Sequence, residues 1–269
     1  MKDQVVVITG ASSGIGLALV HECAAQGATI VMAARNVQKL EEVAADLQKR
    51  GLKCLAVATD VSREEDCKAL MEAAVKAFGT IHILINNAGI SMRALFADLD
   101  LKVVKSVMDV NFWGTVYCTK YAYPYLLQNK GSLVGVSSIA GYKGLPGRTG
   151  YSSSKFAMNG FLEVLRIENL KTGLHVLTAC PGFTASNIRN TALTADGSVQ
   201  GESPRDEDKM MSAEEVARLI VKAIQKRKRE LILTTMGKMT VWLNKRFPAM
   251  MDKMTYNHMA KEENAPIKK

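Results

Sequence analysis

The sequence has few cysteines, no long apolar run, and no repeated or low-complexity segment. Its five cysteines form no C-x-x-C pair and have no neighbouring histidine at metal-ligand spacing. We therefore expect reduced thiols, and neither a disulfide framework nor a metal site. No apolar run approaches the roughly 18 residues that cross a bilayer. The N-terminus also lacks the apolar region and cleavage site of a signal peptide, so we expect a cytoplasmic protein.

Length and composition are those of one globular unit. The chain has 269 residues, of which 48% are hydrophobic and 23% are charged. This balance excludes intrinsic disorder and collagen-like repeats, because the chain can bury a sizeable core.

The excess of positive charge is confined to the C-terminal end. The net charge is +9, and residues 222–269 hold 12 Lys+Arg against 4 Asp+Glu, whereas residues 1–221 hold 23 against 22. Nucleic-acid-binding proteins usually carry a basic face within the fold. The distribution therefore predicts no nucleic-acid partner, and it indicates a surface contact made by the terminal segment.

Short apolar segments alternate with helical ones along the chain. The apolar segments are residues 5–9, 29–33, 52–58, 82–86, 132–136, 174–179 and 231–234. Apolar runs without polar alternation are typical of parallel strands covered on both faces. The pattern predicts a three-layer, doubly wound α/β fold with a seven-stranded parallel sheet in a single domain. The boxes Ser62–Glu65 and Ser212–Glu215 predict two helix starts.

Three regions follow from this pattern. Residues 1–235 form the predicted domain, and residues 236–269 form a basic, Met-rich, helical C-terminal extension. Residues 183–211 are the longest loop, rich in Thr, Ser, Asn, Asp and Gly. Loops of this length are often lids, so we expect it to cover a substrate.

A glycine-rich turn follows the first predicted strand and precedes a helix. Its spacing, G-x-x-x-G-x-G, allows a tight turn and a close approach of a pyrophosphate at the positive end of the helix. The turn therefore predicts a dinucleotide site in a Rossmann fold, and a tight turn without a ligand is the alternative. The predicted contacts are Gly10, Ser12, Ser13, Gly14, Ile15 and Gly16.

The end of the second predicted strand carries a cation instead of an acid. Folds that bind NAD place a carboxylate there, but this chain reads Ala34-Arg35-Asn36, and Glu41 is the next acid. The planar guanidinium of Arg35 fits the 2′-phosphate of NADP. We predict contacts from Arg35 and Asn36 and a preference for NADP(H) over NAD(H), with a solvated arginine as the alternative.

Asp60 and Val61 end the third predicted strand. The carboxylate of Asp60 can accept a hydrogen bond from the adenine amino group. It could equally cap the following helix, where Ser62 competes for that position.

Tyr151 and Lys155 are spaced i, i+4, so on a helix their side chains share one face. A phenol titrates near pH ~10, and a nearby ammonium lowers its pKa. The pair therefore fits acid–base catalysis on a carbonyl or an alcohol. Ser138 lies 13 residues upstream at a predicted strand end, where its hydroxyl can bind a substrate oxygen.

Taken together, these motifs resemble the compact, single-domain branch of the short-chain dehydrogenase/reductase superfamily. The matching motifs lie in family order between residues 5 and 235. They are the turn Gly10–Gly16, Asp60-Val61, Asn86-Asn-Ala-Gly89, Asn111, Ser138, Tyr151-x-x-x-Lys155 and Pro181-Gly182.

The resemblance implies a catalytic tetrad. Tyr151 would be the general acid in reduction and the base in oxidation. Lys155 would lower the pKa of Tyr151 and hold the nicotinamide ribose, so both also count as cofactor contacts. Ser138 would orient the substrate oxygen, and Asn111 would support a water that links Lys155 to solvent.

The resemblance also implies the remaining cofactor contacts, and it requires no metal. They are Asn87, Ala88 and Gly89 on the adenosine side, Pro181 and Gly182 at the nicotinamide pocket, and the hydroxyl of Ser186 for the carboxamide.

Apolar residues flank the predicted tetrad, among them Ile90, Met92, Ile139, Leu145 and Phe183. They favour a small hydrophobic carbonyl or alcohol substrate, although several could belong to the core. The basic, Met-rich tail is similar to those of family members that reduce lipid, steroid or sphingoid-base carbonyls.

The tail interleaves large apolar residues with Lys and Arg, and six of the 14 methionines lie between Met236 and Met259. Such a segment could lie on an anionic membrane surface, on a second subunit or over the substrate loop. The resemblance implies a homodimer or homotetramer formed through the helices around Asn111 and Tyr151.

Our leading hypothesis is an NADP(H)-dependent oxidoreductase that interconverts a hydrophobic ketone and a secondary alcohol. One alternative is a 3-ketoacyl-carrier-protein reductase, whose basic residues would dock the acidic carrier. A non-catalytic, NADP-sensing binding module is the alternative from another class.

Overall fold

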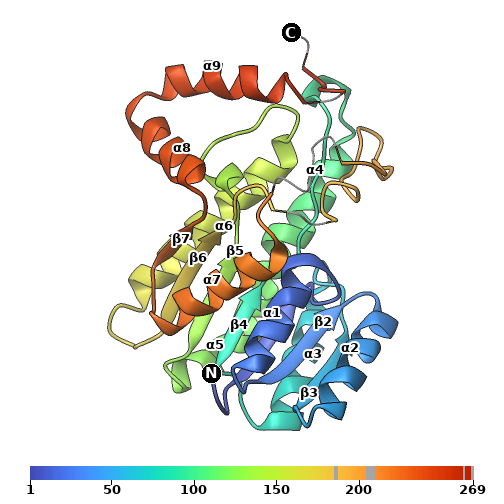
Figure 1. The fold of residues 1–269 in the computed structure, drawn as a ribbon, viewed down its shortest axis with the longest axis vertical. Helices are drawn as coiled ribbons and strands as arrows, with labels where there is room; N and C mark the ends of the chain where they lie inside the picture. The colour runs from blue at the N-terminus through green and yellow to red at the C-terminus, as the bar shows by residue number, and fades with distance from the viewer. Residues whose placement is uncertain (185–186, 204–209, 263, 268–269) are drawn as a thin grey trace.

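The computed structural model describes residues 1–184, 187–203, 210–262 and 264–267. These residues contain one seven-stranded parallel sheet in the order β3-β2-β1-β4-β5-β6-β7 (Figure 1). Each predicted apolar segment forms one of its strands, so the doubly wound fold is confirmed. The strands are β1 (Val5–Thr9), β2 (Thr29–Ala34), β3 (Cys54–Ala58), β4 (Ile83–Asn86), β5 (Ser132–Val136), β6 (His175–Cys180) and β7 (Glu230–Ile232).

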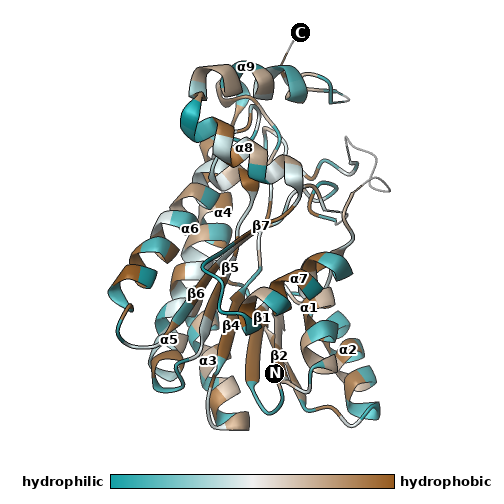
Figure 2. Ribbon diagram, turned by 60° about the vertical axis from the view of Figure 1, so that its left-hand side comes forward, coloured by the Kyte–Doolittle hydropathy of each residue, from teal (hydrophilic) through white to brown (hydrophobic). Residues whose placement is uncertain are grey.

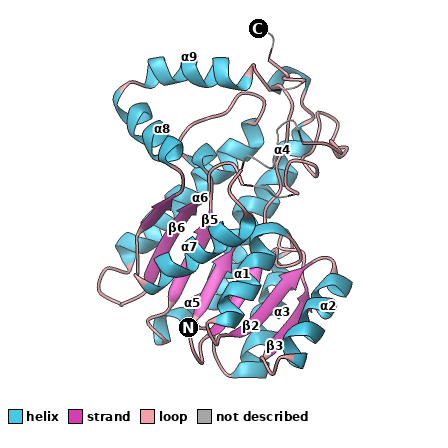
Figure 3. Ribbon diagram, in the orientation of Figure 1, coloured by secondary structure: helices cyan, strands magenta, loops and turns pink. Residues whose placement is uncertain are grey.

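Helices cover both faces of the sheet, whose central strands are strongly hydrophobic (Figures 2 and 3). One face carries α1 (Gly14–Ala25), α2 (Val37–Lys49) and α7 (Ala213–Gln225). The other face carries α3 (Glu64–Phe78), α5 (Gly114–Gln128) and α6 (Thr149–Glu168). The remaining helical elements are η1 (Phe96–Asp98), α4 (Leu101–Met108), the π-helical turn η2 (Asp109–Trp113), η3 (Ile139–Gly141), α8 (Thr235–Arg246) and α9 (Pro248–Met259).

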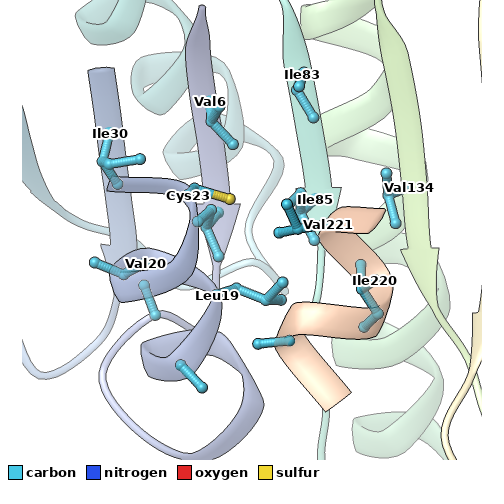
Figure 4. Close-up of a cluster of buried hydrophobic side chains, with 14 of the residues drawn as sticks. Val6, Leu19, Val20, Cys23, Ile30, Ile83, Ile85, Val134, Ile220 and Val221 are labelled. Carbon is cyan, nitrogen blue, oxygen red and sulfur yellow. The ribbon is translucent and has the colours of Figure 1, made fainter. Parts of the chain in front are cut away.

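The core on the α1 and α7 face consists mainly of aliphatic side chains from α1, α2, α7 and five strands of the sheet. Leu19 of α1 and Ile220 of α7 pack with Val6, Ile85 and Val134 of the sheet (Figure 4). All five are fully buried. Burial of each large aliphatic side chain stabilises the folded state by about 1.5–3 kcal/mol. The packing therefore holds α1 and α7 against this face of the sheet.

Both predicted helix starts are confirmed, but only one of the two predicted serine caps forms. Ser212 caps α7, and its hydroxyl accepts a hydrogen bond from the backbone N–H of Glu215 at 3.1 Å. Ser62, in contrast, donates its hydroxyl to Asp60 Oδ1 at 2.7 Å, and α3 begins two residues later at Glu64. The nearer carboxylate thus binds the serine that the sequence assigned to the helix.

The extension is helical, as predicted. Figure 1 places α8 and α9 beyond the carboxyl edge of the sheet, at the end of the molecule opposite the N-terminus. Across the described ranges, no helix is both long and apolar enough to cross a bilayer.

The described residues of the predicted loop, 183–184, 187–203 and 210–211, contain turns and isolated bridges. Leu193 exchanges backbone hydrogen bonds with Ser91 and Arg93 at 2.9 and 2.8 Å. The loop therefore lies along the segment that follows β4. Ser186, the predicted carboxamide contact, lies outside the described residues.

Candidate active site

The predicted site residues gather where the strand order reverses. β1 and β4 are neighbours in the sheet, and Ile8 pairs with Ile85, so the segments that follow these two strands start side by side. The glycine turn follows β1, and Asn86–Gly89 follows β4. Open parallel sheets bind ligands at this position.

The glycine turn leaves no room for a side chain at Gly10 or Gly16. A Cβ on Gly16 would lie 2.0 Å from the carbonyl oxygen of Gly10, and one on Gly10 would lie 2.8 Å from Ala88 Cα. Gly10 also has φ +66°, a left-handed conformation that favours glycine. The resulting cradle of bare backbone fits the pyrophosphate of a dinucleotide, whose oxygens need close N–H donors.

The turn is fixed by the residues after β4. Asn87 Nδ2 donates to the carbonyl oxygens of Thr9 and Gly10 at 2.9 and 3.2 Å. The Thr9 hydroxyl accepts from the backbone N–H groups of Asn87 and Ala88, both at 3.0 Å. The side chain of Asn87 thus holds the turn through its Nδ2. Sequence reasoning missed this role of Thr9.

The N-terminus of α1 points its positive end toward the turn. Ser13 is its N-cap residue, yet the serine side chain forms no capping hydrogen bond, and the first turn of α1 has no acidic residue. An open groove of about 810 Å³ runs along α1 from Gly14 to Ala25 and is bordered by Asn187 and the start of α7. Backbone N–H groups and a helix dipole together favour an anion here.

Arg35 is exposed just after β2. Within the described ranges, its side chain forms no hydrogen bond or ion pair with another residue. Asn36 caps α2 instead, because its side-chain oxygen accepts from the N–H of Lys39 at 3.1 Å. The side chain of Arg35 is therefore available to bind a ligand, whereas the side chain of Asn36 is occupied as a helix cap.

The other predicted adenosine residues shape the end of β3. Asp60 Oδ1 accepts from the N–H and the hydroxyl of Ser62 at 3.0 and 2.7 Å. Val61 packs against Gly114, where a Cβ would lie 2.8 Å from Val61 Cγ2. Asp60 neither caps α3 nor pairs with a cation in the described part of the chain.

The predicted tetrad assembles from three segments, and its fourth member, Asn111, lies in η2. Tyr151 and Lys155 lie on α6, and Ser138 lies between β5 and η3. The Lys155 ammonium is 5.8 Å from the centre of the Tyr151 ring. A Cβ on Gly89 would lie 3.1 Å from Asn111 Oδ1 and 3.6 Å from Lys155 Nζ. The segment after β4, η2 and α6 therefore meet at one point.

Asn111 is fully buried in the π-helical turn η2. Its Oδ1 accepts from the N–H of Ile90 at 2.8 Å, and its Nδ2 donates to Ile90 O and Ser154 Oγ at 3.0 and 2.9 Å. Turns of this kind often occur at functional sites. The side chain joins the β4 loop to α6, so the predicted water contact would fall to the Asn111 main chain.

The protonation states fit a proton donor. Burial raises the pKa of the Tyr151 phenol, and the hydrogen bond with Ser138 and the nearby Arg148 and Arg189 oppose that rise. The net shift is upward, which differs from the predicted lowering by Lys155. Burial also lowers the pKa of Lys155 to about 8, and its ammonium donates to Val136 O at 2.9 Å. At neutral pH Tyr151 therefore carries the proton that carbonyl reduction requires.

The surroundings of the tetrad are less apolar than the sequence predicts. Met92 is fully buried, but Arg148 and Arg189 are also buried. Arg189 comes from the long loop, where its guanidinium donates to Thr184 O at 2.6 Å. The sequence analysis missed both arginines, because nothing in the sequence shows that the side chains of Arg148 and Arg189 are buried.

A profile described as "short chain dehydrogenase" matches residues 4–196. The chain belongs to the short-chain dehydrogenase family. It is 34% identical over 275 residues to mouse "Dehydrogenase/reductase SDR family member 7B", covering 98% of this chain and 84% of the mouse protein. It is 39% identical over 190 residues to Arabidopsis thaliana "11-beta-hydroxysteroid dehydrogenase 1A", covering 70% of this chain and about half (54%) of that protein.

Solved structures agree with this membership. A Burkholderia phymatum short-chain dehydrogenase/reductase in complex with NAD superimposes with a TM-score of 0.83 at 25% identity, over 93% of this chain and 95% of that one. An alcohol dehydrogenase from Thermococcus sibiricus shares the fold, with a TM-score of 0.76 at 24% identity, over 86% and 96% of the two chains. This short-chain dehydrogenase is thus an NAD(P)-dependent oxidoreductase.

Proposed function

We propose that this enzyme uses NADPH to reduce a hydrophobic ketone to a secondary alcohol, and that it runs the reverse reaction with NADP. The observation that carries the proposal is Tyr151. Its phenol is protonated, and it lies beside Ser138 and Lys155 at the carboxyl edge of a sheet whose glycine turn fits a dinucleotide.

Each residue of the tetrad has a separate task. The bound nicotinamide supplies the hydride. The Ser138 hydroxyl holds the substrate oxygen, and the Tyr151 phenol donates a proton to that oxygen as it gains charge. Lys155 holds the ribose and restores the proton of Tyr151. Asn111 keeps the β4 loop against α6 through its bonds to Ile90 and Ser154.

The preference for NADPH is proposed to come from Arg35. Arg35→Ala should weaken NADPH binding about 10- to 100-fold, because hydrogen bonds to a charged group contribute about 1.5–3 kcal/mol. NADH has no 2′-phosphate, so its affinity should change less than about twofold. Fluorescence titration with both cofactors measures this difference.

Arg218→Ala is the matched control, because Arg218 is an exposed arginine on α7 that pairs with Glu215 at 4.0 Å. It should leave both affinities unchanged. Equal binding of NADH and NADPH by the unmodified enzyme would refute the role of Arg35.

The substrate class is proposed from the lining and the relatives. Ile139 lies against Gly237 of α8, where a Cβ would be 2.9 Å from Ile139 Cδ1. The Phe183 ring lies 6.2 Å from the His258 ring of α9, with the two planes tilted by 32°. A ring or long-chain ketone suits such surfaces, and some relatives are named as hydroxysteroid dehydrogenases. A large advantage of acyl-carrier substrates over simple ketones would favour the 3-ketoacyl reductase instead.

The homodimer or homotetramer implied by the resemblance is retained in the proposal. Helix α6 and the turn η2 before α5 expose large apolar side chains, namely Phe156, Val164 and Ile167 on α6 and Trp113 in η2. A second copy of the chain would cover them.

The outer face of the extension is proposed to rest on an anionic membrane surface. Met239 and Trp242 of α8 and Met250 and Met254 of α9 are between 43% and 60% exposed. Lys238, Lys245, Arg246 and Lys253 are exposed among them. Apolar side chains interleaved with cations match the interface of anionic lipids, while Val241 and Met251 face the protein.

Vesicle sedimentation tests this contact. The enzyme should pellet with phosphatidylcholine vesicles that contain phosphatidylserine and much less with phosphatidylcholine alone. The double variant Met239→Glu/Trp242→Glu should lose at least about tenfold in partitioning, because it removes apolar area and adds negative charge. Leu170→Glu, at a site 76% exposed outside the extension, is the control. Light scattering of each variant separates an altered oligomer from lost lipid binding, and a wild-type enzyme that stays in the supernatant contradicts the contact.

A further inference from the structure

The C-terminal segment returns to the tetrad side of the molecule. Glu262, three residues beyond α9, places its carboxylate between Arg93 and Arg148, with Oε2 3.7 and 3.6 Å from their Nη2 atoms. The three side chains are only 3%, 8% and 9% exposed. Charged side chains are seldom buried unless they are paired. The contact of Glu262 with Arg93 and Arg148, called the junction below, is therefore a specific link between distant parts of the chain.

Both arginines belong to segments that carry site residues. Arg148 is the N-cap residue of α6, three positions before Tyr151, and its Nη1 donates to Met92 O at 3.1 Å. Arg93 follows Met92 directly. The backbone N–H of Gly150 also contacts Met92 Sδ at 3.3 Å. The carboxylate thus ties the β4 loop to the start of the helix that holds the acid–base pair.

Backbone contacts extend the same junction. The N–H of Ala94 donates to Gly147 O at 3.0 Å. Pro266, four residues beyond Glu262, covers Gly147 so closely that a Cβ there would lie 2.7 Å from the proline ring. The extension therefore packs on this junction with more than one residue.

Further contacts tie the extension to the tetrad side of the sheet. Asp252 of α9 pairs with the buried Lys143, which follows η3. Asn244 of α8 donates to Tyr142 O at 2.9 Å. These contacts hold the segment that contains Glu262 in place.

We propose that Glu262 is a positioning residue for the reaction: by joining Arg93 to Arg148, it fixes Tyr151 relative to the loop after β4. The kinetic part of this inference rests on the proposed function. The junction itself can be tested without any substrate.

The charges around Tyr151 give the positioning role a distinct signature. The positive charges of Arg148 and Arg189 and the hydrogen bond with Ser138 lower the pKa of the phenol, while Cys180 and burial raise it. Lys155 faces the ring from one turn along α6. Removing the charge of Glu262 takes a negative charge away from Arg148, so the pKa of Tyr151 should fall. Removing Arg148 should raise it.

Glu262→Gln and Arg148→Met test the proposal together. Glu262→Gln should lower kcat roughly ten- to a hundredfold, as expected for a displaced catalytic group, while NADPH affinity stays within about twofold. The alkaline limb of the kcat profile for ketone reduction should move to lower pH in Glu262→Gln and to higher pH in Arg148→Met. Glu262→Asp should recover part of kcat, and Glu72→Gln, at an exposed surface pair, should match the wild type.

Hydrogen exchange supplies a readout that needs no substrate. The amides of Arg93 and Ala94 should exchange faster in Glu262→Gln than in Glu72→Gln. Unchanged exchange would overturn the junction. Faster exchange with an unchanged kcat and pH profile would overturn the positioning role. A wild-type enzyme that reduces no ketone would instead refute the proposed function, while the exchange result would still decide the junction.

Discussion

Replacing Tyr151 with Phe should lower kcat/KM for ketone reduction by about 10²–10⁴-fold, which is the usual contribution of a positioned general acid. The variant keeps the ring that packs with the buried cluster around Met92 and loses only the hydroxyl. NADPH affinity should therefore stay within about threefold. Steady-state kinetics and a fluorescence titration on the same preparation separate the two effects.

The pH dependence of the wild type follows from the same group. Burial raises the pKa of Tyr151, so the phenol stays protonated through neutral pH. The reductive rate should be flat there and fall only on the alkaline side, whereas alcohol oxidation should rise with pH because it needs the ionised form.

Tyr121→Phe is the control for this prediction. Tyr121 lies on α5, and its hydroxyl donates to Glu64 at 2.7 Å on the surface. Its loss should leave turnover unchanged. Full activity in Tyr151→Phe would contradict the proposed role of Tyr151 as the proton donor.

Lys155→Met should abolish most activity while the protein stays folded. The ammonium is buried, and burial lowers its pKa from 10.5 to about 8. Methionine fills similar space without a charge to desolvate. Removing the buried charge should stabilise the folded state. The loss of the hydrogen bond to Val136 O should offset part of this stabilisation, by about 1–3 kcal/mol. We expect kcat to fall by about 10²-fold or more and NADPH binding to weaken.

The stability of the two proteins should also differ in its pH dependence. Between pH 8 and 10.5 the unfolded wild type binds a proton at residue 155 that the folded state has released. Its free energy of unfolding should therefore rise with pH across this window, by about 3 kcal/mol from this group. Lys155→Met should lack that rise in urea titrations, and Lys68→Met, at an exposed pair on α3, should keep it. Parallel pH curves for all three proteins would contradict the buried, shifted lysine.

The sequence predicted the sheet and the convergence of the tetrad because both depend on local pattern. Apolar segments mark strands, and parallel connections bring the strand ends to one edge. The positions of Ser138, Tyr151 and Lys155 could be predicted because they lie at that edge. Asn111 could be located only by its resemblance to a family motif, since no periodicity signals a π-helical turn.

What the sequence could not predict are partners chosen in space. The hydroxyl of Ser62 could have capped α3, but it donates a hydrogen bond to the neighbouring carboxylate of Asp60 instead. The hydrogen bond from the amide of Asn87 to the carbonyl oxygen of Gly10 has no signal in the sequence. Glu262 meets Arg148 across more than one hundred residues, and one acid among many in a basic tail carries no signal of burial.

The most direct test of the central claim follows the hydride and the proton together. The enzyme is incubated with NADPH deuterated at the nicotinamide C4, in turn on each face of the ring, and with a panel of ring and long-chain ketones. The account predicts a secondary alcohol with deuterium on the former carbonyl carbon from one of the two labels, formed by the wild type and nearly absent with Tyr151→Phe. No labelled alcohol from any ketone, or an equal yield from Tyr151→Phe, would contradict it.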